Sequence, residues 1–180
     1  AVSAHAAVQP TSKLGLSAGS TIQVEDAILA LVTLSANDAA VVLAEALGGT
    51  EPRFARMMTE EAQTLGMTRT VFRNASGLPD DDQVSTARDM AILARALVVD
   101  YPRYYPYFAT TSFRWRGRTY ETHNPVLTRV RGGDGMKTGY IRAAGYNLVG
   151  SAIRGDTRFI AVLFGGGSSV DRNYRFVGMR

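Results

Sequence analysis

The first half of the sequence carries apolar residues at helical spacing, every third or fourth position. These stretches predict helices over residues 25–34, 38–47, 50–66 and 86–101. Glu25 and Asp26 fall in the first turn of the first helix, where the helix dipole favours acidic side chains. Thr86 and Asp89 have the spacing of a capping box at the start of the last helix. The pattern therefore predicts a helical layer in this half.

The second half changes to the two-residue period of strands. Residues 112–122 alternate around Gly117 and predict a hairpin, while 145–153 and 158–164 predict a second pair of strands joined at Gly155-Asp156. Residues 170–180 fit a closing helix or a strand. An antiparallel sheet is expected here. Residues 1–20, by contrast, are small and polar with a proline and several glycines, as in a connection within a domain.

The length and composition are those of one ordinary globular domain, or of the larger part of one. A chain of 180 residues can bury one core, and 46% of it is hydrophobic against 20% charged. The net charge is +4, but nearly all the cations are arginines spread along the chain, which argues against a nucleic-acid partner. Arg114, Arg116 and Arg118 are expected to share one exposed face of the hairpin.

Several kinds of site are disfavoured by residue counts. The chain has no cysteine and only two histidines, so we predict no disulfide, no metal site and no cofactor. The aspartates 80–82 follow a loop rich in turn formers and are expected to be solvated. No apolar run approaches the roughly 20 residues that cross a bilayer.

Two short clusters carry candidate chemistry. Ser35-Ala36-Asn37 falls at the polar elbow between two predicted helices, and Lys137-Thr138-Gly139 at the start of a predicted strand. Each cluster alone is weak, because Ser and Asn commonly cap helices and a Lys-Thr-Gly triplet arises by chance. Together they suit acyl transfer through a serine ester, which needs a proton relay, a nearby positive charge and oxyanion donors.

Five of the six residues in the two clusters have a part in such chemistry. Ser35 can relay a proton while Lys137 biases its hydroxyl, and the Asn37 amide can orient a substrate amide. The Thr138 hydroxyl can bind a substrate carboxylate, and Gly139 lets a substrate backbone lie against the strand.

The same stretches resemble D-alanyl-D-alanine carboxypeptidases, the low-molecular-mass penicillin-binding proteins. The resemblance is carried by residues 35–45, 74–80, 85–89, 124–125, 134–140 and 143–149, which spread through most of the chain. It implies an α+β fold of the β-lactamase/D,D-peptidase type, with a helical subdomain, an antiparallel sheet flanked by helices, and residues 1–180 forming part of the catalytic domain. Within it, Ser35, Asn37 and Lys137 would be catalytic, and Lys137, Thr138, Gly139 and Tyr140 would bind substrate.

The resemblance also implies an activity and a location. It implies removal of the terminal D-alanine from peptidoglycan stem peptides through an acyl-enzyme that β-lactams trap, with the Tyr140 N–H as one oxyanion donor. Because peptidoglycan lies outside the cytoplasmic membrane, a periplasmic or extracytoplasmic location is expected, with membrane anchoring left open.

The sequence departs from the family at the nucleophile. The family's Ser-x-x-Lys motif has no match, because Lys13 is preceded three places earlier by Pro10 and Lys137 by Asp134. We therefore expect that an N-terminal piece is missing, and that the chain alone is inactive unless a companion fragment supplies the serine. The alternatives are a non-catalytic wall-binding module and a class A β-lactamase, against which Ala36 counts because those enzymes usually carry Ser-Asp-Asn.

Overall fold

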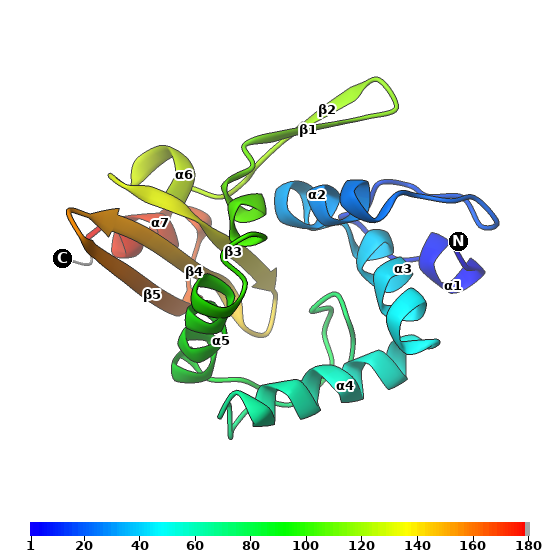
Figure 1. Cartoon of the computed structure of the whole chain (residues 1–180), viewed down its shortest axis with the longest axis horizontal. Coiled ribbons are helices and arrows are strands. Elements are labelled where there is room, and N and C mark those ends of the chain that lie inside the picture. Colours follow the sequence, from blue (N-terminus) through cyan, green and yellow to red (C-terminus); the bar gives the residue numbers. More distant parts are fainter. Residues whose placement is uncertain (179–180) are drawn as a thin grey trace. The chain divides into compact units, whose positions relative to one another are not determined.

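The computed structural model describes residues 1–178 and divides the chain into two compact units (Figure 1). The first unit comprises residues 1–61, 71–83 and 110–122, and the second comprises 62–70, 84–109 and 123 onward. Each unit is described by itself.

The helices are α1 Ala4–Ala7, α2 Val24–Leu34, α3 Asn37–Gly48, α4 Glu51–Thr64, α5 Ala87–Asp100, α6 Val126–Arg129 and α7 Ser169–Gly178, with a 3-10 turn η1 at Tyr105–Ala109. The strands are β1 Ser112–Trp115, β2 Arg118–Glu121, β3 Gly133–Ile141, β4 Gly145–Arg154 and β5 Thr157–Gly166. The predicted helices and both strand pairs are confirmed to within a few residues. The closing segment is a helix up to Gly178, and residues 179 and 180 lie outside the described part.

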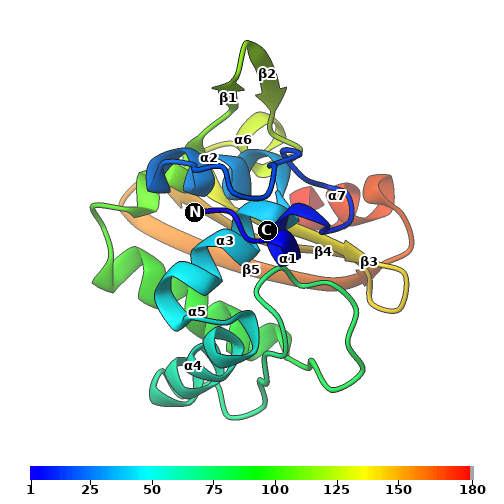
Figure 2. The same cartoon turned by 90° about the vertical axis from the view of Figure 1, so that its right-hand side faces the viewer.

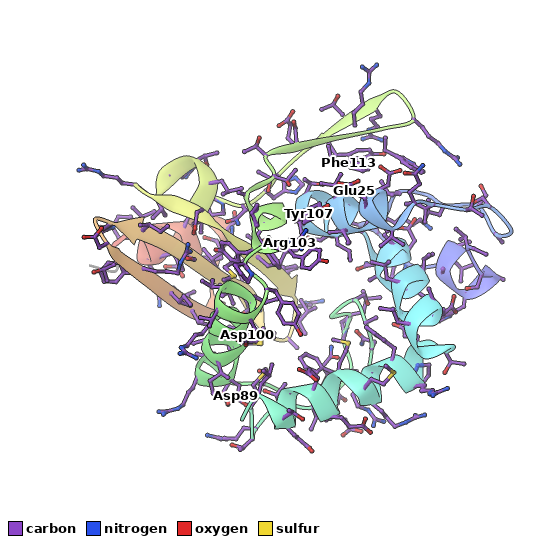
Figure 3. The ribbon with its side chains drawn as sticks, in the orientation of Figure 1. Glu25, Asp89, Asp100, Arg103, Tyr107 and Phe113 are labelled. Atoms are coloured by element: carbon purple, nitrogen blue, oxygen red, sulfur yellow. The ribbon has the colours of Figure 1, made fainter. Side chains whose placement is uncertain are left out.

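In the first unit, helices α2 and α3 pack together beneath the hairpin of β1 and β2. Phe113 of β1 is buried against Ala27 and Ala30 of α2, and Figure 3 shows its ring directed at that helix. Residues 1–20 contribute to the hydrophobic core and are more than a connection, because Val2 and Leu16 are buried in a cluster with Val41 of α3. The helical layer therefore depends on the segment that precedes it.

The hairpin separates its arginines onto two faces, so the expectation of one shared face is wrong. In the register Arg114 pairs with Thr119, whereas Arg118 pairs with Trp115. Directly opposite residues share a face, so Arg118 lies with the aromatic residues. Its guanidinium carbon is 5.0 Å from the centre of the Tyr120 ring.

The second unit is a three-stranded antiparallel sheet between two layers of helix (Figures 1 and 2). The strand order is β3-β4-β5, which places β3 and β5 at its edges. On one face Met136 of β3 is buried with Ala94 of α5 and Tyr105 of η1. On the other face Leu148 of β4 is buried with Phe176 of α7. The two clusters show which strand side chains face α5 and which face α7.

The caps that the sequence predicts are present. The Thr86 hydroxyl accepts the N–H of Asp89 at 3.1 Å at the start of α5, where Figure 3 labels Asp89. Asp89 also accepts the hydroxyl of Thr70 at 2.7 Å, and this hydrogen bond is the main reason that the pKa of its carboxyl is lowered. This helix start is therefore tied to a distant loop as well as capped.

Within residues 1–178, no group of three histidine, cysteine, aspartate or glutamate side chains is placed to hold a metal ion. Asp80 and Asp82 instead lie 3.9 and 4.0 Å from the guanidinium of Arg73. None of the helices in the same residues is long and apolar enough to span a membrane.

Candidate functional site

Ser35 forms the elbow between α2 and α3 in a left-handed backbone conformation. It is the C-cap of α2 with φ 59° and ψ 45°, and its N–H donates to the carbonyl of Leu31 at 3.1 Å. This conformation is uncommon for a residue with a side chain and ends a helix abruptly. Ala36 is extended and buried, and α3 begins at Asn37. The abrupt turn is what leaves Ser35 at the junction of the two helices.

Asn37 and Asp38 tie the start of α3 to the preceding segment. The Asn37 side-chain amide donates to the carbonyl of Pro10 at 3.0 Å, and its backbone N–H donates to the carbonyl of Ser12 at 2.8 Å. The fully buried Asp38 carboxylate accepts the N–H groups of residues 14, 15 and 16 at 2.9 to 3.0 Å. Charged acceptors make strong hydrogen bonds, so this carboxylate holds the segment firmly on α3.

Lys137 lies in the interior of the edge strand β3, not at the strand's start as predicted. It pairs with Val149 of β4, and its ammonium group donates to the carbonyl of Thr138 at 2.8 Å. Burial lowers the pKa of this amine from 10.5 to about 8, and the positive charge of Arg172 adds to the effect. The amine is therefore mostly charged at neutral pH but gives up its proton far more readily than an exposed lysine.

Arg172, in the first turns of α7, is a second cation of this region and is buried. Only 6% of the residue is exposed, and its guanidinium donates to the side-chain oxygen of Asn173 at 2.8 and 3.0 Å. Two neighbouring cations repel each other, and a negatively charged ligand would relieve that repulsion. The region around Lys137 is thus electrostatically prepared for an anion such as a carboxylate.

Gly139 and Tyr140 lie on the exposed part of the same edge strand. A side chain at Gly139 would meet only the Cβ of Asn147, at the ordinary distance of 3.9 Å, so no neighbour within the chain requires glycine there. The Tyr140 ring packs on Tyr146 with a centroid distance of 4.3 Å. The strand therefore offers open backbone beside Lys137, as an added peptide strand would need.

The candidate residues fall into two groups, one in each unit. Ser35 and Asn37 belong to the first unit, and Lys137, Thr138, Gly139 and Tyr140 belong to the second. Within each group the residues are consecutive or nearly so along the chain. The approach of the Ser35 hydroxyl to the Lys137 amine stays a prediction.

Two residues beside these groups were missed by sequence reasoning. Asp38 could be taken only as an acidic residue in a first helical turn, because nothing in the spacing indicates that it accepts three N–H groups of a distant segment. Arg172 is one of many dispersed arginines, and only the packing of α7 against β4 and β5 brings its charge near Lys137.

Comparison with known proteins identifies the family. The family model for D-alanyl-D-alanine carboxypeptidase matches residues 1–168. The chain is 36% identical over 163 residues to the D-alanyl-D-alanine carboxypeptidase DacD of Salmonella typhimurium, covering 90% of this chain and 42% of that protein. It therefore spans less than half the length of that relative.

Solved structures agree in fold. The D-alanyl-D-alanine carboxypeptidase DacD of Francisella tularensis matches with a TM-score of 0.93 and 29% identity, over 97% of this chain and 55% of that one. Penicillin-binding protein D2 of Listeria monocytogenes in its ampicillin-bound form matches with a TM-score of 0.79 and 33% identity, over 100% of this chain and 73% of that one. The expected D,D-peptidase-like α+β fold is confirmed, and the chain belongs to the D-alanyl-D-alanine carboxypeptidase family.

Proposed function

We propose that this chain supplies two sides of the active site of a serine-type D-Ala-D-Ala carboxypeptidase that acts on peptidoglycan stem peptides and is acylated by penicillins. One side is Ser35 with Asn37, and the other is Lys137 with Thr138 and Gly139. The observation that carries the proposal is the edge strand β3, where open backbone lies beside an amine whose pKa is lowered to about 8. The family match and the ampicillin-bound relative support the same class of substrate.

The proposed reaction has two half-steps. A serine hydroxyl attacks the carbonyl carbon of the penultimate D-alanine, and the peptide bond breaks as the leaving D-alanine amine takes a proton. Water then hydrolyses the ester and restores the serine. The Ser35 hydroxyl passes the proton to the leaving amine, and the charge on Lys137 orients that hydroxyl. The Tyr140 N–H is one of the donors to the oxyanion.

The substrate would be held along β3 by its backbone and by its carboxylate. The Thr138 hydroxyl and the cations Lys137 and Arg172 suit a terminal carboxylate, because charge-assisted hydrogen bonds are the stronger ones. The peptide backbone would pair with β3 beside Gly139, where a bulkier residue would hold it away. Asn37 would orient the substrate amide through its side chain.

The attacking serine is proposed to come from outside these 180 residues, which contain no Ser-x-x-Lys. A companion polypeptide, or a further segment of a longer chain, would supply it. The chain alone is then expected to be inactive. A periplasmic or extracytoplasmic location follows from the substrate class, and fractionation of cells that make the full gene product would check it.

The test is labelling with a fluorescent penicillin, after which the polypeptides are separated under denaturing conditions and their intact masses are measured. The 180-residue chain is tested alone and together with the segment that carries Ser-x-x-Lys. Label only in the mixture, on that segment, supports the proposal. Label on the 180-residue chain itself contradicts the assigned place of the nucleophile, and absence of label in an assembled mixture contradicts the proposed activity.

Two alternative functions are distinguished from this one by whether D-alanine is released and by how long bound penicillin persists. A non-catalytic wall-binding module would bind isolated peptidoglycan without releasing D-alanine, and the absence of Ser-x-x-Lys from these residues is what favours it. A β-lactamase would release hydrolysed penicillin quickly, whereas a carboxypeptidase keeps its acyl-enzyme. Amino-acid analysis of released D-alanine and the lifetime of the label decide between them.

A further inference from the structure

The strand that carries Lys137 is irregular just before that residue. The register pairs Gly133 with Ala152 and Gly135 with Ser151, so Asp134 is an extra residue in β3. After this bulge Gly135 has φ +143° and Met136 has φ +89°. A positive φ is a genuine outlier for a side chain as large as methionine and persists only where the surroundings impose it.

The irregularity changes the direction of the Met136 side chain. In a regular ladder Met136 would share the face of its partner Gly150, where an added Cβ would lie 2.3 Å from the Phe176 ring and 2.7 Å from Val126. The Met136 side chain is buried instead against Tyr105, on the other face of the sheet. The backbone at Met136 therefore departs from regular strand conformation one residue before Lys137, which pairs with Val149 in the restored register.

Asn124 holds the carbonyl group of Met136, the residue that precedes the lysine. Its side-chain N–H donates to the carbonyl of Met136 at 2.8 Å, and its side-chain oxygen accepts the N–H of Val126 at 3.0 Å. Only 5% of Asn124 is exposed, so water competes little for these bonds. The two bonds leave one orientation of the amide, because the carbonyl needs a donor and the N–H needs an acceptor.

We propose that Asn124 is a positioning residue for Lys137: by holding the carbonyl of Met136 it fixes the strained backbone that precedes the lysine, and so places the lysine amine in its partly buried position on the edge strand. The inference rests on the proposed function only for the role given to Lys137. Asn124 itself is assigned no contact with substrate or with the reacting atoms. It acts through the backbone of the residue that precedes the lysine.

The substitution Asn124→Ser separates positioning from a structural role. A serine hydroxyl can still accept the N–H of the residue two places on, as asparagine does in such turns, but is too short to donate to Met136. Asn74→Ser is the matched control, because Asn74 accepts the N–H of Gly77 at 2.8 Å and donates to the carbonyl of Leu78 at 2.8 Å in the first unit.

The readout is the titration of lysine carbons by NMR in the full 180-residue chain. Lys13 and Lys137 are the only lysines, so two resolved signals are expected and Lys13 serves as an internal reference. We expect Lys137 to titrate near pH 8 in the unchanged protein and in Asn74→Ser. In Asn124→Ser its midpoint should rise by about one unit, since an amine that is less firmly buried regains solvation.

Two results would overturn the inference. One is an unchanged Lys137 midpoint in folded Asn124→Ser, and the other is a Lys137 signal that titrates together with Lys13 in the unchanged protein. Should Asn124→Ser fail to fold, hydrogen exchange of the Asn124 side-chain amide in the unchanged protein decides instead. Exchange more than about tenfold slower than that of a free asparagine supports the anchor, and exchange at the free rate refutes it.

The measurement is independent of the proposed activity. No penicillin, substrate or nucleophile takes part in the titration, so failure of the labelling experiment leaves its result unaffected. Conversely, an unchanged midpoint would remove the role of Asn124 and leave the family and the two sides of the site as they stand.

Discussion

The two groups of candidate residues, around Ser35 in the first unit and around Lys137 in the second, are held in different ways. The Ser35 side is a short elbow between helices, fixed by side chains that reach one preceding segment, with Asp38 accepting from residues 14, 15 and 16. The Lys137 group lies on an edge strand, fixed by its register with β4 and by the hydrogen bond from Asn124 to the carbonyl of Met136. Buried hydrogen bonds to the Asp38 carboxylate stabilise the Ser35 group. In the Lys137 group, burial disfavours the charged form of the lysine amine.

The two groups contribute to stability in opposite directions. The Asp38 carboxylate has its N–H partners and contributes to folding. The lowered pKa of Lys137 means that the folded protein disfavours its charged form. Removing the first group should therefore destabilise the protein, whereas removing the second should cost function alone.

The largest expected effect is the loss of acylation in Lys137→Met. Methionine has a similar length without the charge, so penicillin labelling of the assembled protein should slow by about 100- to 1000-fold, as when one electrostatic group of an acyl-transfer site is removed. The melting temperature should not fall. Lys13→Met is the matched control and should label normally; a Lys137→Met protein that labels at the normal rate would remove this lysine from the site.

The next effect is on stability, in Asp38→Ala. The substitution leaves three N–H groups of residues 14–16 without their acceptor, and we expect the free energy of unfolding to fall by about 3 kcal/mol. Denaturant unfolding measures it. Asp82→Ala removes an aspartate side chain that is 80% exposed and should change stability little. Equal stability of the two variants would contradict the anchoring role of Asp38.

Two glycines of the sheet differ in the space available for a side chain. Gly139→Ala should leave stability within about 0.5 kcal/mol, because its side chain would meet only a Cβ at 3.9 Å, yet it should slow labelling. Gly150→Ala should destabilise by about 1–3 kcal/mol, because its Cβ would lie 2.3 Å from the Phe176 ring. Unfolding and labelling are measured on both variants. A Gly139→Ala protein with unimpaired labelling would show that no ligand backbone approaches there.

A further expected effect is a dependence of stability on pH. Because the pKa of Lys137 is about 8 in the folded chain and 10.5 ordinarily, the unfolded chain binds more protons between these values and stability rises with pH there. Below the lower value both states are charged and the penalty is constant. The raised pKa of Tyr105 opposes the trend above about pH 10. Urea unfolding between about pH 8 and pH 10 should show the rise, and Lys137→Met should reduce it.

Much of the fold could be predicted from local patterns. Helical spacing and the Thr86–Asp89 cap located α5, and alternation around Gly117 located the hairpin. These elements follow from neighbouring residues alone. The positions of Arg114 and Arg118 on opposite faces could not be predicted, because register depends on which residues pair across the turn.

The same distinction between local patterns and distant contacts applies to the candidate functional residues. The motifs around Ser35 and Lys137 could be identified from the sequence because the residues of each motif are consecutive in the chain. Asp38 and Asn124 act on backbone groups of other segments, at separations that no local pattern encodes. Their roles emerge only where buried N–H and carbonyl groups need partners.

Four of the helices, the two strand pairs, the two motifs and the family resemblance could be predicted from the sequence, since short-range propensity and residue identity are sufficient for these. The burial around the Lys137 amine, the charge of Arg172 near it and the positive φ of Met136 come from tertiary packing. The physical reason is that solvation, electrostatic interaction and ladder register depend on what surrounds a residue in space, and those surroundings come from distant parts of the chain.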